Sequence, residues 1–248
     1  MMQITKSFLL ESIRNTGVFF GNIMTPFIFI LCSWGCSLAI KDSPETLDFM
    51  IKGQFLPISI MLLIFGFAFS LTTVYLADLR ANNTLHWLKR TNILPATYFI
   101  GTGFGVFLLM NAALILVLLG YALIISISWK AIVTIIVICN FVLLAMYPLC
   151  FIVAGIVKNG KTAQSMLTPV MLIFMFSITM PSMFLTLNEK HPQDYYSFLA
   201  WNPMLYLTDT LQVQLQLHTE TWLPVYQYVI ILSIVCACLT ILAKKLYR

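Results

Sequence analysis

A short basic stretch between Asp78 and Gly101 has the residue types best suited to meeting a soluble partner. It reads DLRANNTLHWLKRTNILPATYFIG and lies between two apolar runs, each long enough to cross a bilayer. Charged and aromatic side chains in a loop of this kind allow a membrane protein to receive force from a partner in solution. Its three bases, Arg80, Lys89 and Arg90, are equally suited to contact lipid headgroups.

The residues needed for enzyme chemistry are not brought together by this sequence. A G-x-x-x-x-G-K-T match spans Gly155–Thr162, but it joins two apolar runs rather than a strand and a helix, the context that a phosphate-binding loop needs. No G-x-S-x-G pattern occurs, and His86, His191 and His218 all fall outside the apolar runs. Cys32 and Cys36 are four residues apart on one predicted helix face, but no third ligand for a soft metal accompanies them. We therefore expect no catalytic residues, no metal site and no cofactor bound by this chain.

Composition indicates an integral membrane protein. Hydrophobic residues make up 60% of the 248 residues and charged residues only 9%, whereas soluble domains carry about 25% charged residues. The six cysteines fall in apolar runs, where they act as small buried side chains rather than as a disulfide framework. The net charge of +5 is spread over several loops, so we expect no nucleic-acid binding.

The elements that position the basic stretch are predicted to be membrane-spanning helices. A span needs about 20 apolar residues, and the continuous runs favour an all-α fold over a barrel of short alternating strands. Residues 18–248 are expected to form a six-helix transmembrane domain, with a loop at 77–97 and an outer segment at 188–221. The predicted spans are 18–40, 55–76, 98–127, 131–157, 167–187 and 222–243.

Residues 1–17 are predicted to form a separate amphipathic helix that lies in the membrane interface. Ile4, Phe8, Leu9 and Ile13 recur at helical spacing, with charged residues between them. A cleaved signal peptide is the alternative, and the missing A-x-A-like site disfavours it.

The charges predict the orientation and the energy source. With both termini in the cytoplasm, ten of the 14 basic residues fall on the inner side, as basic residues prefer. The 14 basic and nine acidic residues all lie outside the predicted spans. Ion-coupled transporters keep ionisable groups within the bilayer, so we expect the energy to come from outside this chain.

The fifth predicted span is rich in methionine and phenylalanine and contains a proline. Such a flexible, polarisable wall suits varied apolar ligands, although lipid contact or core filling is the favoured explanation. Pro26, Pro148 and Pro181 each interrupt a span and can bend it. The candidate residues for a substrate path are Met171, Phe174, Met175, Met180 and Pro181.

Two other patterns have alternative interpretations. Gly17–Gly21 and Gly101–Gly105 have GxxxG spacing, which permits either a dimer contact or packing within the chain. In the outer segment, Asn202 and Pro203 form a good helix start. The alternation of leucine and glutamine over 211–217 instead has strand spacing; we predict a short helix that begins at Asn202.

Taken in order along the chain, these features resemble the permease subunits of type-2 ABC exporters. In that family the first cytoplasmic loop typically reads E-x-R-x-x-G-T-L-x-x-L, followed by a proline-rich turn and Y-x-x-G. Here Asp78 stands for the glutamate, Asn83 for the glycine and Asn92 for the first turn proline. Other family features are an early proline in span one, a proline near the outer end of span five and Asn-Pro before span six, matched by Pro26, Pro181 and Asn202–Pro203. The matching loop residues are Arg80, Thr84, Leu85, Leu88, Pro95, Tyr98 and Gly101.

The resemblance implies a partner that hydrolyses ATP. Two permease chains, identical or related, would pair in a bacterial cytoplasmic membrane above two copies of a separate ATPase that binds ATP and Mg. The cytoplasmic loop would then couple the two proteins, with apolar contacts from Leu85, Trp87 and Leu88. The residues that this coupling role would involve are Asp78, Arg80, Asn83, Thr84, Leu85, Trp87, Leu88, Lys89 and Arg90.

The function expected on these grounds is export of an amphipathic or hydrophobic substrate, such as a peptide, a bacteriocin, a toxin or a drug. A polysaccharide or lipid-linked export permease and a non-transporting membrane subunit are the alternatives. An intramembrane enzyme is disfavoured, because no buried nucleophile–base pair is predicted.

Overall fold

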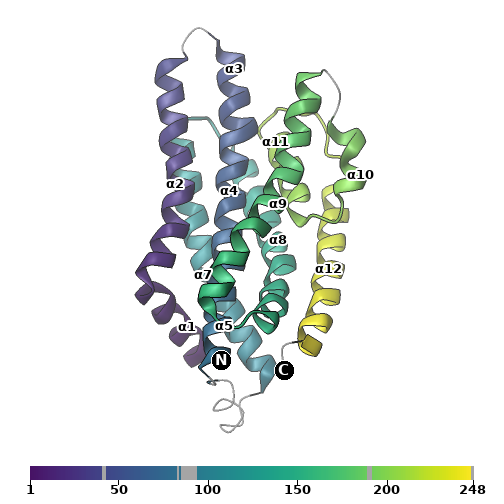
Figure 1. Ribbon diagram of the computed structural model, residues 1–248. Helices are drawn as coiled ribbons and strands as arrows, with labels where there is room; N and C mark the ends of the chain where they lie inside the picture. The colour runs from purple at the N-terminus through teal and green to yellow at the C-terminus, as the bar shows by residue number, and fades with distance from the viewer. Residues whose placement is uncertain (41–42, 83, 85–93, 189–191, 247–248) are drawn as a thin grey trace.

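The computed structural model describes all residues except 41–42, 83, 85–93, 189–191 and 247–248, and the regular elements in the part described are all helices. Six helices are long and apolar enough to cross a membrane, which confirms the predicted fold class. They form one bundle, and the first helix and the end of the last lie at the same end of it (Figure 1). We call this the terminal end, and the opposite end the far end. The six are α2 (Thr16–Ala39), the helix Pro44–Ala81, α7 (Pro95–Ala122), α8 (Trp129–Ile156), α9 (Gly160–Leu187) and α12 (Val225–Leu246).

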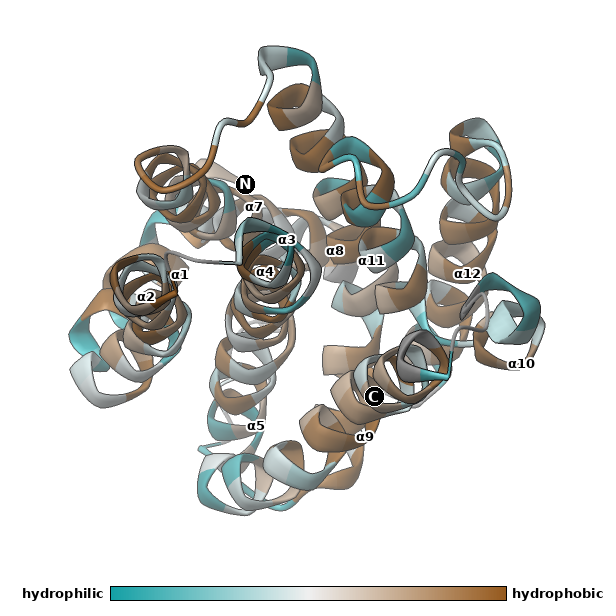
Figure 2. Cartoon of the chain, turned by 90° about the horizontal axis from the view of Figure 1, so that it is seen from above, coloured by the Kyte–Doolittle hydropathy of each residue, from teal (hydrophilic) through white to brown (hydrophobic). Residues whose placement is uncertain are grey.

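The second spanning helix is the structural centre of the bundle. It runs without a break for 38 residues through α3 (Pro44–Asp48), η1 (Phe49–Phe55), α4 (Leu56–Ile64), η2 (Phe65–Leu71) and α5 (Thr72–Ala81). Its most apolar window is 78% buried, against 11% for α2 and for α12. Seen from above, α4 and α8 lie toward the middle and α2, α9 and α12 toward the rim (Figure 2).

Two wide π-helical turns interrupt the α-helical pattern of this central helix. The first, η1, ends two residues before Pro57, whose ring nitrogen has no hydrogen to donate to a carbonyl in the preceding turn. In the second, η2, carbonyl oxygens accept side-chain hydrogen bonds from neighbouring helices. Asn22 Nδ2 donates to Gly66 O at 2.9 Å, and Cys150 Sγ donates to Ala68 O at 2.8 Å. These bonds tie the central helix to α2 and α8.

The predicted N-terminal helix is present as α1 (Met2–Arg14), and its place in the membrane interface stays a prediction. It packs along α7, where Thr5 Oγ1 donates to Gly101 O at 2.8 Å and Phe8 is fully buried. A Cβ added to Gly105 would lie 2.5 Å from Phe8 Cδ1. Gly101 and Gly105 therefore receive α1 within the same chain, whereas a Cβ on Gly17 or Gly21 would meet nothing within 4 Å.

Several helix limits differ from the predicted spans. The third helix ends at Ala122 rather than at residue 127, and α9 begins at Gly160, seven residues before the predicted start. The polar first turn of α9 is helical because Asn159 Oδ1 accepts the backbone N–H of Thr162 at 2.9 Å. Hydropathy alone does not detect such a turn. The prolines within α2, α8 and α9 are accommodated inside continuous helices.

The segment between α9 and α12 forms η3 (Pro192–Tyr195), α10 (Tyr196–Leu199) and α11 (Pro203–Gln214) in the far half of the bundle (Figure 1). The prediction of a helix rather than a strand is confirmed. Asn202 is the N-cap, with Oδ1 accepting the N–H of Met204 at 3.0 Å, and Pro203 occupies the first turn. Every residue from Pro203 to Gln212 is buried, and α11 packs against α8. This helix folds back into the bundle and does not lie along its outer surface.

Candidate functional site

Asp78 and Arg80 stand at the end of α5, where the central helix reaches the terminal end of the bundle. Asp78 Oδ1 accepts the backbone N–H of Gly160, the first residue of α9, at 2.8 Å. A Cβ on Gly160 would lie 2.5 Å from both carboxylate oxygens of Asp78. The close approach of this carboxylate to α9 therefore requires a residue without a side chain at position 160.

Arg80 makes the complementary contact with the preceding helix. Its Nη1 donates to Ala154 O at 3.2 Å and also to Gly155 O, both in the last turn of α8. An anion at a helix N-terminus and a cation at a helix C-terminus both oppose the partial charges of the helix dipole. We call this arrangement the α5 clamp: Asp78, Arg80, Ala154, Gly155 and Gly160.

The N-terminal helix reaches the same end of the bundle. Phe8 of α1 meets Tyr75 of α5 edge to face, with ring centroids 4.9 Å apart. Burial raises the pKa of the Glu11 carboxyl above its ordinary value, and the negative charge of Asp78 raises it further. The clamp therefore bonds α5 to α8 and α9, and α1 packs against α5 beside it.

The structure describes only part of the predicted coupling residues. Asp78 and Arg80 lie in the clamp, and Thr84 is half-buried just beyond α5. Their contacts lie within the chain, a role that the sequence did not predict. The role of the others in binding a partner stays a prediction, because they lie outside the described residues: Asn83, Leu85, Trp87, Leu88, Lys89 and Arg90.

The candidate substrate-path residues on α9 do not share one surface. Met175 is buried within the chain, whereas Met180 has 44% of its surface exposed. Phe174 is half-buried, and its ring meets Trp201 edge to face at 5.5 Å. Met171 and Pro181 are also half-buried.

Asn202 is the residue through which α9 and α11 are joined. Besides capping α11 with its oxygen, it donates from Nδ2 to Phe174 O at 2.7 Å and to Ser177 Oγ at 3.0 Å. Its amide is fully buried, and both its oxygen and its nitrogen are hydrogen-bonded. The sequence revealed the capping role but not this cross-link, since capping is local and the link spans 28 residues.

One expectation is wrong: the bundle does contain a buried ionisable side chain. Asp209 of α11 has 0% of its surface exposed. The error arose because all charges between the predicted fifth and sixth spans were assigned to an exposed outer segment. The available signal was local, since Asp209 follows the apolar stretch MLYLT and precedes TLQV.

Metal binding has no evident place in the described part of the chain. There, no three His, Cys, Asp or Glu side chains lie close enough together to hold a metal ion. Cys32 is exposed on the rim helix α2, and Cys36 is half-buried on the same helix.

Six long apolar helices, with a buried helix α11 inside the bundle, define a multi-pass helical membrane protein. Comparison with protein families places it more narrowly. The family model described as "ABC-2 family transporter protein" matches residues 47–244, which is most of the chain. The chain therefore belongs to the ABC-2 transporter family and is a membrane-spanning transport component. The search of curated proteins found no match.

Proposed function

We propose that this chain is the permease subunit of an ATP-driven exporter in the bacterial cytoplasmic membrane. Membership of the ABC-2 family supports a role in transport. The observation that carries the mechanism is the α5 clamp: the helix leading into the predicted coupling loop is bonded to the end of α8 and the start of α9. A push on that loop would therefore be delivered to two spanning helices at once.

In this proposal both termini and the α5 clamp face the cytoplasm, as the distribution of basic residues favours. Two copies of a separate ATPase, which binds ATP and Mg, dock beneath the clamp and the 77–97 loop. Closure of the ATPases on ATP moves α5, and the clamp passes the movement to α9. Asn202 then links α9 to α11 in the outward-facing half.

The second permease chain, identical or related, is placed against the rim helices α2 and α9. Both expose large apolar side chains, among them Met24 and Ile28 on α2 and Ile173 and Phe176 on α9. The open surface at Gly17 and Gly21 gives room for a close helix contact. The substrate path then runs between the two chains, along the exposed face of α9.

An amphipathic or hydrophobic substrate, such as a peptide, bacteriocin, toxin or drug, fits this path best. The exposed surface of α9 in its membrane-spanning part includes Met180, Met183 and Phe184. These side chains offer apolar, adaptable contacts and no charge. A polysaccharide or lipid-linked substrate would need more polar and stacking groups along the same surface.

The coupling role is tested by replacing Leu85 and Trp87 together with glutamate and measuring co-purification of the ATPase. We expect the loss of most of the bound ATPase, because two buried charges would replace the central apolar contacts of the interface. The matched control is Leu123→Glu with Trp129→Glu, since these residues are 90% and 78% exposed in and beside the α7–α8 turn. Equal recovery of ATPase with both variants would contradict the docking role of the 77–97 loop.

A further inference from the structure

The carboxylate of Asp209 collects hydrogen bonds from three separate segments in the far half of the bundle. Tyr228 Oη, at the start of α12, donates to Oδ2 at 2.6 Å, and the backbone N–H of Trp222 donates to the same oxygen at 3.0 Å. Gln193 Nε2, in η3, donates to Oδ1 at 3.2 Å. Asp209 thus joins α11 to η3, to the loop before α12 and to α12 itself.

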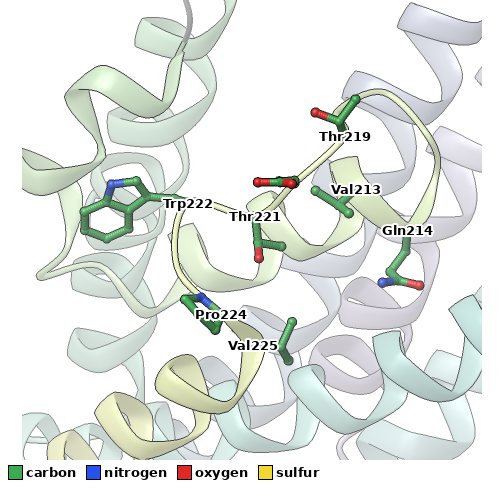
Figure 3. Close-up of a pocket in the computed structure, with 8 residues that line it drawn as sticks. Val213, Gln214, Thr219, Thr221, Trp222, Pro224 and Val225 are labelled. Atoms are coloured by element: carbon green, nitrogen blue, oxygen red, sulfur yellow. The ribbon is translucent and has the colours of Figure 1, made fainter.

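The same groups hold the loop between α11 and α12 in place. Gln193 Nε2 also donates to Glu220 O at 2.8 Å, and Tyr228 Oη accepts the N–H of Leu223 at 3.1 Å. Figure 3 shows this loop arching from Thr219 past Trp222 to Pro224, beside Val213 and Gln214 near the end of α11. The loop and the start of α12 are therefore fastened to α11 through one carboxylate.

Asp209 is the counterpart of Asn202 on the same helix. Asn202 bonds the start of α11 to α9, and Asp209, two turns later, bonds it to α12. The difference between them is charge. The three donors to Asp209 are uncharged, so an ionised carboxylate here is held by hydrogen bonds in a site with no exposed surface. A buried charge of this kind is costly unless all its partners are in place.

We propose that Asp209 is a positioning residue that fastens the outward end of the transport path, and that outward opening breaks its bonds to Tyr228 and Trp222. This inference rests on the proposed export function. When α9 moves, Asn202 carries α11 with it, and the bonds of Asp209 are the polar link between α11 and the start of α12. Outward opening hydrates the carboxylate, and this hydration offsets part of the loss of the hydrogen bonds from Tyr228 and Trp222.

Titration of Asp209 gives the opening a pH dependence of defined sign. Burial raises the pKa of Asp209 above its ordinary value, although the hydrogen bonds from Tyr228, Trp222 and Gln193 oppose this rise. Hydration on opening returns the pKa toward the ordinary value, so opening releases a proton and becomes easier as the pH rises through the closed-state pKa. The other titratable groups that face the carboxylate are His218, Tyr196, Tyr228 and, through the loop, Glu220.

The test is a double-mutant cycle on the full chain in lipid nanodiscs, read by amide hydrogen exchange of the 216–224 loop at pH 7.5. Tyr228→Phe removes the shortest bond to Asp209, and we expect the loop to exchange about thirtyfold faster, as for a lost bond to a charged acceptor. In the Asp209→Asn background, Tyr228→Phe should make the loop exchange only about threefold faster, which is the effect of losing a hydrogen bond between uncharged groups. Exchange in α8 should stay unchanged, which shows that the bundle is intact.

Tyr206→Phe is the matched control. Its ring centroid lies 4.9 Å from that of Tyr228, and its hydroxyl donates to Ala200 O at 2.8 Å and not to Asp209. Tyr206→Phe should change the exchange rate of the 216–224 loop by the same factor with Asp209 and in the Asp209→Asn background. An equal effect of Tyr228→Phe with and without Asp209→Asn would overturn the proposal.

A pH series distinguishes the fastening role of the Asp209 carboxylate from ordinary packing of the side chain. In a His218→Gln background, loop exchange corrected for the chemical rate should be slower at pH 4 than at pH 7.5 when Asp209 is present, and should not vary in Asp209→Asn. The same pH profile in both would also overturn the proposal. These measurements need neither ATPase nor substrate. If the coupling between Tyr228→Phe and Asp209→Asn is found in a chain that binds no ATPase, the fastening role of Asp209 is supported and only the export function is contradicted.

Discussion

Asp78→Ala is expected to lower the apparent Tm of the purified chain by about 6 °C and to abolish ATP-driven transport. The substitution removes the acceptor of the Gly160 N–H and the negative charge at the start of α9. A bond to a charged group and its interaction with the helix dipole are together worth about 2 kcal/mol at a half-buried site. For a chain of this size, each kcal/mol corresponds to roughly 3 °C.

The loss of transport should be larger than the modest loss of stability would explain, because α5 would keep only the Arg80 half of the clamp. The carbonyls of Ala154 and Gly155 would still be bonded, so α8 would follow α5 and α9 would not. Asp78→Asn keeps a hydrogen-bond acceptor of the same shape without the charge. It should therefore give an intermediate Tm and partial transport.

Asp48→Ala is the control, since it is the same substitution at the other end of the same continuous helix. Asp48 pairs with Lys52 at 2.6 Å, and its side chain is 51% exposed. Exposed pairs of this kind contribute less than about 1 kcal/mol, so Tm and transport should stay close to those of the unaltered chain. If Asp78→Ala behaved like Asp48→Ala, the clamp would have no role in coupling.

Asn202→Ala is the second change with a large expected effect, a loss of about 3 kcal/mol in the free energy of unfolding. Roughly 1 kcal/mol comes from the lost N-cap of α11. The remainder comes from the two bonds to Phe174 O and Ser177 Oγ, which lie in a fully buried position. The apparent Tm should fall by about 9 °C.

Asn188→Ala provides the comparison for this variant. Asn188 is exposed, and its Nδ2 donates to Phe184 O at 2.7 Å within the last turn of its own helix. Its loss should change Tm by at most about 2 °C. A similar fall for both variants would show that Asn202 acts only as a local cap and does not join α9 to α11.

Local patterns in the sequence were sufficient to predict the long helices of this fold and the start of α11, but not the short elements η3 and α10. The apolar runs predicted six spanning helices, the spacing of Ile4 and Phe8 predicted α1, and Asn202–Pro203 predicted the start of α11. Each of these signals is contained in a few neighbouring residues. The ends of the helices were predicted less well, because polar turns such as the start of α9 are helical through capping and not through hydropathy.

Contacts between distant segments were beyond the reach of the sequence. Asp78 and Arg80 were singled out, yet their partners lie 82 and 74–75 residues further along the chain. Gly101 and Gly105 were expected to receive a close neighbour, but nothing in their spacing identified α1. Asp209 was placed in a short helix of the outer segment, and its burial was not predicted, because its three donors lie 13 to 19 residues away along the chain.

The proposed mechanism requires that this chain moves solute only when a separate ATPase drives it. The most direct measurement is the flux of a labelled amphipathic peptide across proteoliposomes that contain the chain alone, the chain with its co-purified ATPase, or that complex with ATP and Mg. Peptide flux is expected only from the complex with ATP and Mg. Flux of similar rate from the chain alone, without ATPase or nucleotide, would contradict it.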